Sequence, residues 1–483
     1  MSATSSSNNN ESGTRSAEID EVMARARAAQ ATYEQYDQKA VDEVVTALGW
    51  AIVKPENNQI LSEMAVRDTG LGNVKDKLTK NRRKTMGLLR DLKGAKSVGV
   101  IAKYAEKGLV EIARPVGVVG AIVPSTNPAA TPANKTINAV KGRNAIVLAP
   151  SPKGESTCVQ LLTFMHDELD RIGAPRDLVQ KLPAPISKAG TAQLMQSVDL
   201  IVATGSQNNV RGAYSSGTPA VGVGAGNVVS IIDETADVAA AAKKIVLSKS
   251  FDNATSCSSE NNLIVVENNY DKAIEALAQN NAILLNAADQ QSLEAQLWSG
   301  GRLNQGLIAR EANTIAKLAG LSTEGVENAK VLLVEEDQYG PDHPFSGEKL
   351  SPVLTVYKAK DFEHAKDIAR GIMDYQGKGH SLSIHTTNDD RPMEIGLTMP
   401  VCRVIVNQIH CYATGGSFDN GLPFSLSMGC GSWGGNSISE NMNYRHYLNI
   451  TRISRSITAN EPTDETLFGE YWQQYACGPN SVA

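Results

Sequence analysis

The sequence predicts an α/β protein with two doubly wound, Rossmann-like domains and an additional β-arm. Short, fully apolar strand-like runs alternate with helix-like runs in two sets, which are separated near residue 250. Continuous apolar runs are typical of parallel strands, because helices cover both faces of such sheets. A segment of alternating apolar and polar residues precedes the first set. The length of 483 residues corresponds to about three domains at about 150 residues each.

The first half of the chain contains a tail, a helical region, a hairpin and the first set of strands. Residues 1–16 are rich in Ser and Asn and predict a disordered tail. Residues 17–96 are rich in Ala, Leu, Lys and Arg and have apolar residues at helical spacing. In residues 97–115 the runs VGVIAKY and LVEIARP flank AEKG, which indicates a β-hairpin arm. With the strands VGVVGAIVP, NAIVLAP and DLIVATG, residues 17–248 are expected to form one domain.

The second half repeats the alternation of strands and helices. The pattern resumes with the strands NVVSIID, NNLIVVE, LTVYKAK, SLSIHT and RVIVNQ. We expect residues 249–430 to form the second domain. Residues 431–483 begin rich in Asn and Ser and continue with the extended run HYLNITRIS, which predicts a C-terminal arm between domains or subunits.

Charge and cysteine content exclude several classes of function. The chain has 46 Lys and Arg against 52 Asp and Glu, a net charge of −6, which gives no electrostatic reason to expect DNA or RNA as a partner. No apolar run approaches the roughly 18 residues of a membrane helix, and the N-terminus lacks a signal-peptide pattern. The six cysteines form no CxxC pair or zinc-like cluster, so we expect no metal site and a cytoplasmic location.

Three predicted strand-to-helix turns are candidate ligand sites. In open parallel sheets, ligands bind at the carboxyl ends of strands, where backbone N–H groups at helix starts meet anions. Small polar residues also occur there for helix capping alone, so the three turns together carry more weight than any one. The candidate residues are Ser125, Thr126 and Asn127, then Ser151 and Lys153, then Gly205 and Ser206.

Cys257 is the candidate nucleophile. Most cysteines are small buried hydrophobic residues. The neighbours of Cys257, in FDNATSCSSE, are instead small and polar, and they lie between a predicted helix and the strand NNLIVVE. A thiol at such a junction can act as a nucleophile, with its thiolate favoured by backbone dipoles.

Seven segments taken together resemble a known family. They occur in order over residues 17–455 and read PVGVVGAIVPSTNP, KGRNAIVLAPSP, AYSSGTPAVGVGAGN, SKSFDNATSCSSE, GEKLSPVL, GKGHS and MGCGSWGGNSISEN. The series resembles CoA-acylating aldehyde dehydrogenases of the aldehyde dehydrogenase superfamily. The resemblance implies the aldehyde dehydrogenase fold, with a nicotinamide cofactor domain, a catalytic domain and β-arms that form a homodimer or homotetramer.

The resemblance also implies roles for individual residues. Cys257 matches the family nucleophile, and Asn127 matches the asparagine whose amide stabilises the oxyanion. His380 matches a histidine of the acylating branch, either a proton carrier for CoA or a framework residue. Glu348 matches the acid that contacts the nicotinamide ribose. The other expected cofactor contacts are Ser125, Thr126, Ser151, Lys153, Gly205, Ser206 and Gly224.

One departure from the wider superfamily favours CoA over water as the acyl acceptor. Hydrolytic aldehyde dehydrogenases resemble this sequence but place a glutamate base some thirty residues before the cysteine. Here the corresponding segment, residues 217–232, contains no carboxylate. Attack by water on a thioester needs a general base, whereas the CoA thiol is already partly ionised near neutral pH. We therefore expect CoA as co-substrate.

The loop after the last catalytic strand is the candidate for substrate choice. Its polar side chains can hold an anionic head group, although they can also only cap turns or face an oligomer interface. The sequence of this loop, NQ…ATGGSFDNG, most resembles the branch of the family that acts on sulfoacetaldehyde or succinate semialdehyde. We predict sulfoacetaldehyde, with succinate semialdehyde and acetaldehyde as alternatives. The predicted substrate contacts are Gln408, His410, Tyr412 and Thr414.

The sequence also bears on the choice between NADP and NAD and on two competing functions. Lys153 lies where the adenosine ribose is expected, and no carboxylate is present in that turn to repel a 2′-phosphate. The sequence thus favours NADP while allowing NAD. An inactive scaffold is disfavoured because Cys257, Asn127 and Glu348 are all retained. A hydrolytic semialdehyde dehydrogenase is disfavoured by the missing glutamate.

Overall fold

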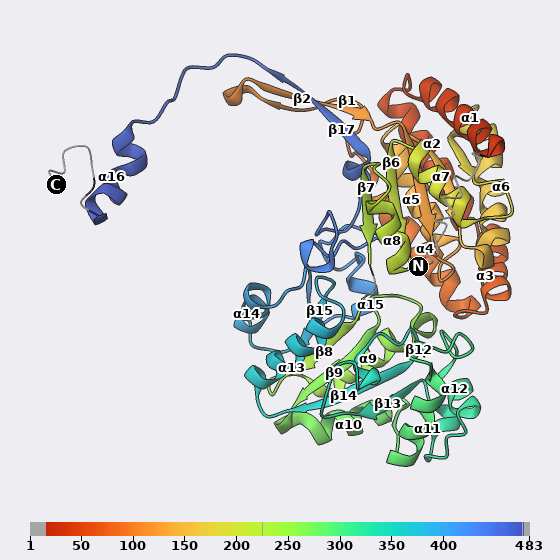
Figure 1. Ribbon diagram of the computed structural model, residues 1–483, viewed down its shortest axis with the longest axis vertical. Coiled ribbons are helices and arrows are strands. Elements are labelled where there is room, and N and C mark those ends of the chain that lie inside the picture. Colours follow the sequence, from red (N-terminus) through yellow and green to blue (C-terminus); the bar gives the residue numbers. More distant parts are fainter. Residues whose placement is uncertain (1–15, 225, 476, 478–483) are drawn as a thin grey trace, which may run out of the picture.

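The computed structural model describes residues 16–224, 226–475 and 477, and contains two α/β units and a β-arm (Figure 1). Of the predicted N-terminal tail, residues 1–15 lie outside the described part. Among the residues that are described, no helix is both long and apolar enough to cross a membrane. All six cysteines are free thiols.

Four helices open the described chain, as the helical spacing of residues 17–96 predicts. Their boundaries follow from residues that cap helices. Asp37 accepts a hydrogen bond from the backbone N–H of Ala40 at the start of the second helix, and Asn73 accepts one from Asp76 at the start of the fourth. Gly70 ends the third helix with a left-handed φ of 67°. The four are α1 (Ala17–Tyr33), α2 (Gln38–Val53), α3 (Pro55–Thr69) and α4 (Val74–Leu92).

A five-stranded parallel sheet forms the first α/β unit, with the strand order β5-β4-β3-β6-β7. Every residue of β3 and β4 is buried, as expected for strands covered on both faces. The strands are β3 (Val118–Val123), β4 (Ala145–Pro150), β5 (Val179–Lys181), β6 (Leu200–Thr204) and β7 (Ala220–Val223). The connecting helices are α5 (Ala130–Lys141), α6 (Glu155–Arg171), α7 (Lys188–Ser197) and α8 (Gln207–Tyr214).

A seven-stranded parallel sheet forms the second unit, with the order β10-β13-β14-β9-β8-β15-β16 (Figure 1). Its strands are β8 (Val228–Ile232), β9 (Glu260–Val266), β10 (Ala282–Leu284), β13 (Val331–Glu335), β14 (Val353–Ala359), β15 (Leu382–His385) and β16 (Val404–Val406). Two short strands, β11 (Trp298–Ser299) and β12 (Arg302–Leu303), form a separate hairpin. The helices are α9 (Val238–Ser250), α10 (Tyr270–Gln279), α11 (Ala287–Leu297), α12 (Ala312–Leu318), α13 (Phe362–Tyr375), α14 (Asp390–Thr398) and α15 (His410–Ala413).

The change from one sheet to the other occurs earlier than the expected domain boundary at residue 248. Strand β8 pairs with β9 and β15 of the second sheet, so the crossing lies between β7 and β8. Apolar runs predict strands but do not state which sheet a strand joins, which explains the difference.

The β-arm is a three-stranded antiparallel sheet in the order β1-β2-β17. The predicted hairpin is present as β1 (Gly99–Tyr104) and β2 (Leu109–Pro115), and β17 (Leu448–Ser454) pairs with β2 along its whole length. Beyond β17 the chain runs away from both sheets to α16 (Asp464–Tyr475), as Figure 1 shows.

Candidate active site

Cys257 lies in a tight turn between helix α9 and strand β9 of the second unit. Three consecutive residues before it have left-handed backbones: Asp252 (φ 49°), Asn253 (φ 52°) and Ala254 (φ 59°). Such conformations cost roughly 1–3 kcal/mol each outside glycine, so neighbouring structure must hold them. Contacts with neighbouring residues must therefore hold the turn that presents the thiol.

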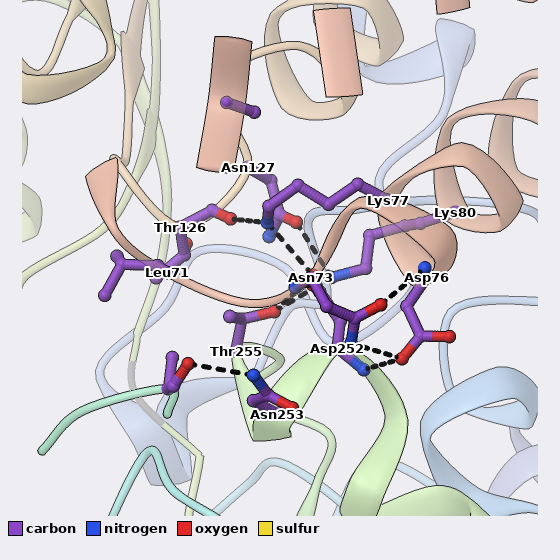
Figure 2. Close-up of polar contacts among 12 residues, drawn as sticks. Leu71, Asn73, Asp76, Lys77, Lys80, Thr126, Asn127, Asp252, Asn253 and Thr255 are labelled. Carbon is purple, nitrogen blue, oxygen red and sulfur yellow. Dashed lines mark hydrogen bonds and ion pairs between the residues drawn. The ribbon is translucent and has the colours of Figure 1, made fainter. Parts of the chain in front are cut away.

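Asp252 anchors this turn to helix α4 through two lysines (Figure 2). Its buried Oδ2 atom accepts hydrogen bonds from Lys80 Nζ at 2.5 Å and from Lys77 Nζ at 3.1 Å. Its Oδ1 atom accepts one from the backbone N–H of Asn73 at 3.0 Å. Burial alone opposes ionisation, but Lys80 and Lys77 hold the pKa of Asp252 below its usual value. One carboxylate thus compensates two ammonium groups only in part.

The Asn127 side chain is oriented by the same cluster. Lys80 Nζ donates to Asn127 Oδ1 at 2.9 Å and to Thr255 Oγ1 at 2.9 Å, while Lys77 Nζ donates to the backbone carbonyl of Thr126 at 3.1 Å (Figure 2). Because its carbonyl oxygen is bound to Lys80, the amide NH₂ group of Asn127 is available as a donor. This is the group that an oxyanion site requires.

His380 contacts the candidate nucleophile. Its Nε2 atom lies 3.4 Å from Cys257 Sγ, and its Nδ1 atom lies 2.7 Å from Ser381 Oγ. Ser381 Oγ lies 2.9 Å from Nε2 of His410, so a continuous row of polar groups runs from the thiol into the interior. Burial, with a further contribution from Arg403, lowers the pKa of His380 to about 3. The imidazole is therefore neutral and, in this buried state, a weak base.

The Cys257 thiol is protonated in this state. Burial raises its pKa to about 12, and the nearby Glu348 carboxyl acts in the same direction. The expectation from the sequence that backbone dipoles favour the thiolate is therefore wrong for this state, because desolvation outweighs them. Attack by Cys257 needs a base, and His380 Nε2 is in contact with the sulfur.

Glycine is required beside the nucleophile. A Cβ atom at Gly226 would lie 2.2 Å from the carbonyl oxygen of Cys257 and 3.1 Å from Cδ2 of His380. Gly226 belongs to the carboxylate-free segment 217–232, and its backbone N–H is hydrogen-bonded to the Glu348 carboxyl group. Burial raises the pKa of Glu348 to about 8. The predicted cofactor acid therefore stands next to the reaction centre.

The predicted cofactor residues of the first unit gather at one edge of its sheet. They follow the carboxyl ends of β3, β4 and β6, which are adjacent strands. Gly205 has φ 148°, and the Ser206 hydroxyl caps α8 by accepting from the N–H of Asn209. At the end of β7, a Cβ atom at Gly224 would lie 2.7 Å from Gln207 Nε2. Ser125 and Thr126 follow β3 and are half-buried. After β4, Ser151 is half-buried and Lys153 is exposed.

A narrow cavity lies between helix α4 and the catalytic turn. It leaves about 30 Å³ for the centres of water-sized molecules. Only a short substrate chain fits such a space. Six of the residues that line it are Lys80, Arg83, Lys84, Asn127, Phe251 and Tyr412.

Three of the four predicted substrate contacts do not reach this cavity. His410 and Thr414 are fully buried, and the Thr414 hydroxyl donates to the His410 carbonyl at 2.9 Å. Gln408 accepts a hydrogen bond from Asn420. Of the four predicted substrate contacts, Tyr412 lines this cavity, and the other three stay predictions.

Sequence reasoning missed the cationic residues of helix α4. Lys77, Lys80 and Lys84 are spaced as one face of a helix, which is a signal that the sequence contains. Lysines usually form a solvated face, so the spacing alone does not predict a buried site.

Comparison with known proteins identifies the family. Residues 6–298 match the model of the aldehyde dehydrogenase family. The chain belongs to the aldehyde dehydrogenase family. A curated relative from Cupriavidus necator, sulfoacetaldehyde dehydrogenase (acylating), is 56% identical over 93% of this chain and 92% of its own. A sulfoacetaldehyde dehydrogenase from an Acholeplasma species is 44% identical over 94% of each chain.

A solved structure has the same fold as this aldehyde dehydrogenase. The acetylating aldehyde dehydrogenase from Geobacillus thermoglucosidasius is 35% identical, covers 92% of this chain and 98% of its own, and superposes with a TM-score of 0.88. The fold predicted from the sequence is thus confirmed.

Proposed function

We propose that this enzyme oxidises sulfoacetaldehyde to its CoA thioester with reduction of NAD(P), through a thioester on Cys257. The observation that carries the proposal is the contact of 3.4 Å between His380 Nε2 and Cys257 Sγ. The orientation of the Asn127 amide by Lys80 supports it. The name of the Cupriavidus necator relative, together with the cationic, narrow cavity, supports sulfoacetaldehyde as the aldehyde.

The first half-reaction forms the acyl-enzyme. The neutral His380 Nε2 accepts the thiol proton as Cys257 Sγ attacks the aldehyde carbon. The Asn127 amide donates a hydrogen bond to the developing oxyanion. A bound oxidised nicotinamide would supply the acceptor for the hydride lost from the carbon bonded to Cys257 Sγ. Cys257 then carries the acyl group as a thioester.

The second half-reaction transfers the acyl group to CoA. His380 first releases the proton taken from Cys257 to solvent. The CoA thiol then loses its proton to His380 and attacks the thioester carbon, and Cys257 leaves as the thiolate and takes that proton back from His380. Asn127 stabilises the second oxyanion in the same way. Segment 217–232 supplies no carboxylate that could activate water in place of CoA. The Glu348 carboxyl that binds the Gly226 N–H has its pKa raised to about 8, so it is largely protonated near neutral pH.

The residues at the sheet edge fit a nicotinamide nucleotide. The start of α8 after Gly205 presents free backbone N–H groups for a pyrophosphate, and the close approach of Gly224 to Gln207 leaves no room for a side chain there. Lys153 is exposed at the end of β4 and can pair with a 2′-phosphate. NADP is therefore the nucleotide that we propose, with NAD as the alternative.

Two further parts of the proposal concern assembly and cellular location. The β-arm presents β1, β2 and β17 as an exposed sheet outside both α/β units, and we propose a homodimer or homotetramer built on it. The cytoplasmic location predicted from the free thiols fits a protein whose nucleophile must stay reduced.

The test is the rate of NAD(P) reduction with three aldehydes, with and without CoA. We expect sulfoacetaldehyde to exceed succinate semialdehyde and acetaldehyde in kcat/KM, and turnover to depend on CoA. Equal rates with the three aldehydes would refute the substrate assignment. Turnover without CoA would indicate hydrolysis, and no turnover under either condition would indicate a scaffold.

A further inference from the structure

The cavity beside Cys257 is strongly cationic at its α4 side. Lys80, Arg83 and Lys84 line it, and none of its described lining residues is acidic. Lys80 is committed to Asp252 and Asn127. Arg83 and Lys84 are the cations whose charge remains for a ligand.

Lys84 is buried without an ionic partner. Its Nζ atom donates to the backbone carbonyls of Gly415 at 2.8 Å and Gly416 at 3.4 Å, and no carboxylate forms an ion pair with it in the described part of the chain. A buried ammonium with only neutral acceptors carries a desolvation cost that an anion would offset. Lys84 lines the cavity together with Ser256, the residue before Cys257, so it lies near the reaction centre.

Arg83 presents an unused donor. Its Nη2 atom donates to Ser417 Oγ at 2.6 Å, and Ser417 Oγ in turn contacts Asp419, whose charge interacts with the guanidinium. The guanidinium stacks on the Tyr412 ring, 4.9 Å from its centroid. The Nε–H group is buried and has no acceptor among the described residues. Ser417 therefore occupies the Nη2 donor of the guanidinium, and the Nε donor has no partner among the described residues.

We infer that Arg83 and Lys84 bind the sulfonate of the aldehyde substrate, while its carbonyl end lies between Cys257 and Asn127. This inference rests on the proposed function and assigns its specificity to helix α4. A sulfonate has three acceptor oxygens, which suits two donors on separate side chains better than a planar carboxylate does. The narrow cavity further favours a two-carbon chain over the four carbons of succinate semialdehyde.

The first test compares an anionic with a neutral aldehyde. The variants are Lys84→Met and Arg83→Gln, with Arg82→Gln as the matched control because Arg82 is the exposed neighbour on the same helix. We expect the ratio of kcat/KM for sulfoacetaldehyde over propionaldehyde to fall roughly 10- to 100-fold in each of the first two, as for loss of a charge-assisted hydrogen bond, and to stay constant in the control. An unchanged ratio in both variants, including equal losses with the two aldehydes, would overturn the inference.

The second test separates this inference from the proposed function. Ethanesulfonate, which lacks an aldehyde, is expected to compete with propionaldehyde in the wild-type enzyme and to lose this effect in Lys84→Met. That result supports the anion site even if sulfoacetaldehyde itself is not turned over, in which case the proposed substrate falls and the site stands. Absence of competition in the wild type, or stronger competition by butanoate, would overturn the sulfonate assignment.

Discussion

Replacing Lys80 by Met tests how the oxyanion site is held in place. In the structure, Lys80 Nζ bonds Asn127 Oδ1 at 2.9 Å and Asp252 Oδ2 at 2.5 Å. Without the ammonium, the Asn127 amide can rotate and its NH₂ group is no longer directed at the substrate. Asp252 keeps Lys77 as a partner at 3.1 Å, so the buried carboxylate is not left alone. We therefore expect a folded enzyme with a weakened oxyanion site.

The size of the effect follows from the two roles of Lys80. Loss of one oxyanion-hole donor costs about 10²–10³ in kcat, which sets the limit for Asn127→Ala. Lys80→Met keeps the amide and loses only its orienting bond, so kcat should fall roughly 10- to 100-fold. Loss of a hydrogen bond to a charged group should lower the free energy of unfolding by about 1.5–3 kcal/mol.

Lys77→Met is the matched control, because Lys77 shares Asp252 but bonds the carbonyl of Thr126 instead of the Asn127 side chain. The assay is the pre-steady-state formation of reduced nucleotide, measured beside urea unfolding of both variants. We expect similar losses of stability and a clearly larger loss of rate in Lys80→Met. Equal loss of rate in the two variants at equal folded fraction would refute the orienting role.

The remaining predictions concern the base, the glycine, the anchoring carboxylate and the anion site. His380→Ala should slow acyl-enzyme formation by about 10²–10⁴-fold with little change in stability, measured as the burst of reduced nucleotide; a normal burst would contradict its role as base. Gly226→Ala should abolish the burst because its Cβ would lie 2.2 Å from the nucleophile's carbonyl oxygen, whereas Gly396→Ala, where a Cβ meets no atom within 4 Å, should be active. Asp252→Asn should lower the free energy of unfolding by about 3–5 kcal/mol, since it leaves two buried ammonium groups without a carboxylate. The pKa of Asp252 is lowered on folding, so its contribution to stability is present above the unfolded value of about 3.9 and is lost as the pH falls through the lower folded value. Urea unfolding at several pH values measures this contribution. A difference in unfolding free energy between wild type and variant that does not depend on pH would contradict it. Burial lowers the pKa of Lys84 to about 7, with neighbouring cations lowering it and two cysteines raising it. The kcat/KM for sulfoacetaldehyde should therefore fall as the pH rises above about 7, whereas the kcat/KM for propionaldehyde should show no such fall. Identical pH profiles for the two aldehydes would argue against this role of Lys84.

Local patterns in the sequence predict the elements well and their partners less well. Strands β3 and β4 are continuous apolar runs, as the sequence predicts. Membership of a sheet depends on contacts between distant segments, which is why the boundary expected at residue 248 does not coincide with the change of sheet between β7 and β8. Cys257 and Asn127 were singled out by their small polar surroundings, whereas the roles predicted for them came from the resemblance over the whole chain.

The cationic residues inferred to bind the substrate were missed for a related physical reason. Polar side chains such as His410 and Thr414 follow a catalytic strand and look available, but in the structure they satisfy one another or the row behind His380. Arg83 and Lys84 lie some 170 residues before the nucleophile on a helix whose lysines look solvated. Only the folded chain shows that this face is buried.

Helix α4 joins the two tasks of the site, which has a consequence for selectivity. Lys80 orients the oxyanion donor, and Arg83 and Lys84, within one helical turn of it, are inferred to hold the head group. Because Asp252 compensates Lys77 and Lys80 only in part, the cavity is cationic even though the whole chain carries a net charge of −6. The field that an anionic substrate meets is therefore set by this one buried helix face, and the net charge of the chain carries no information about it.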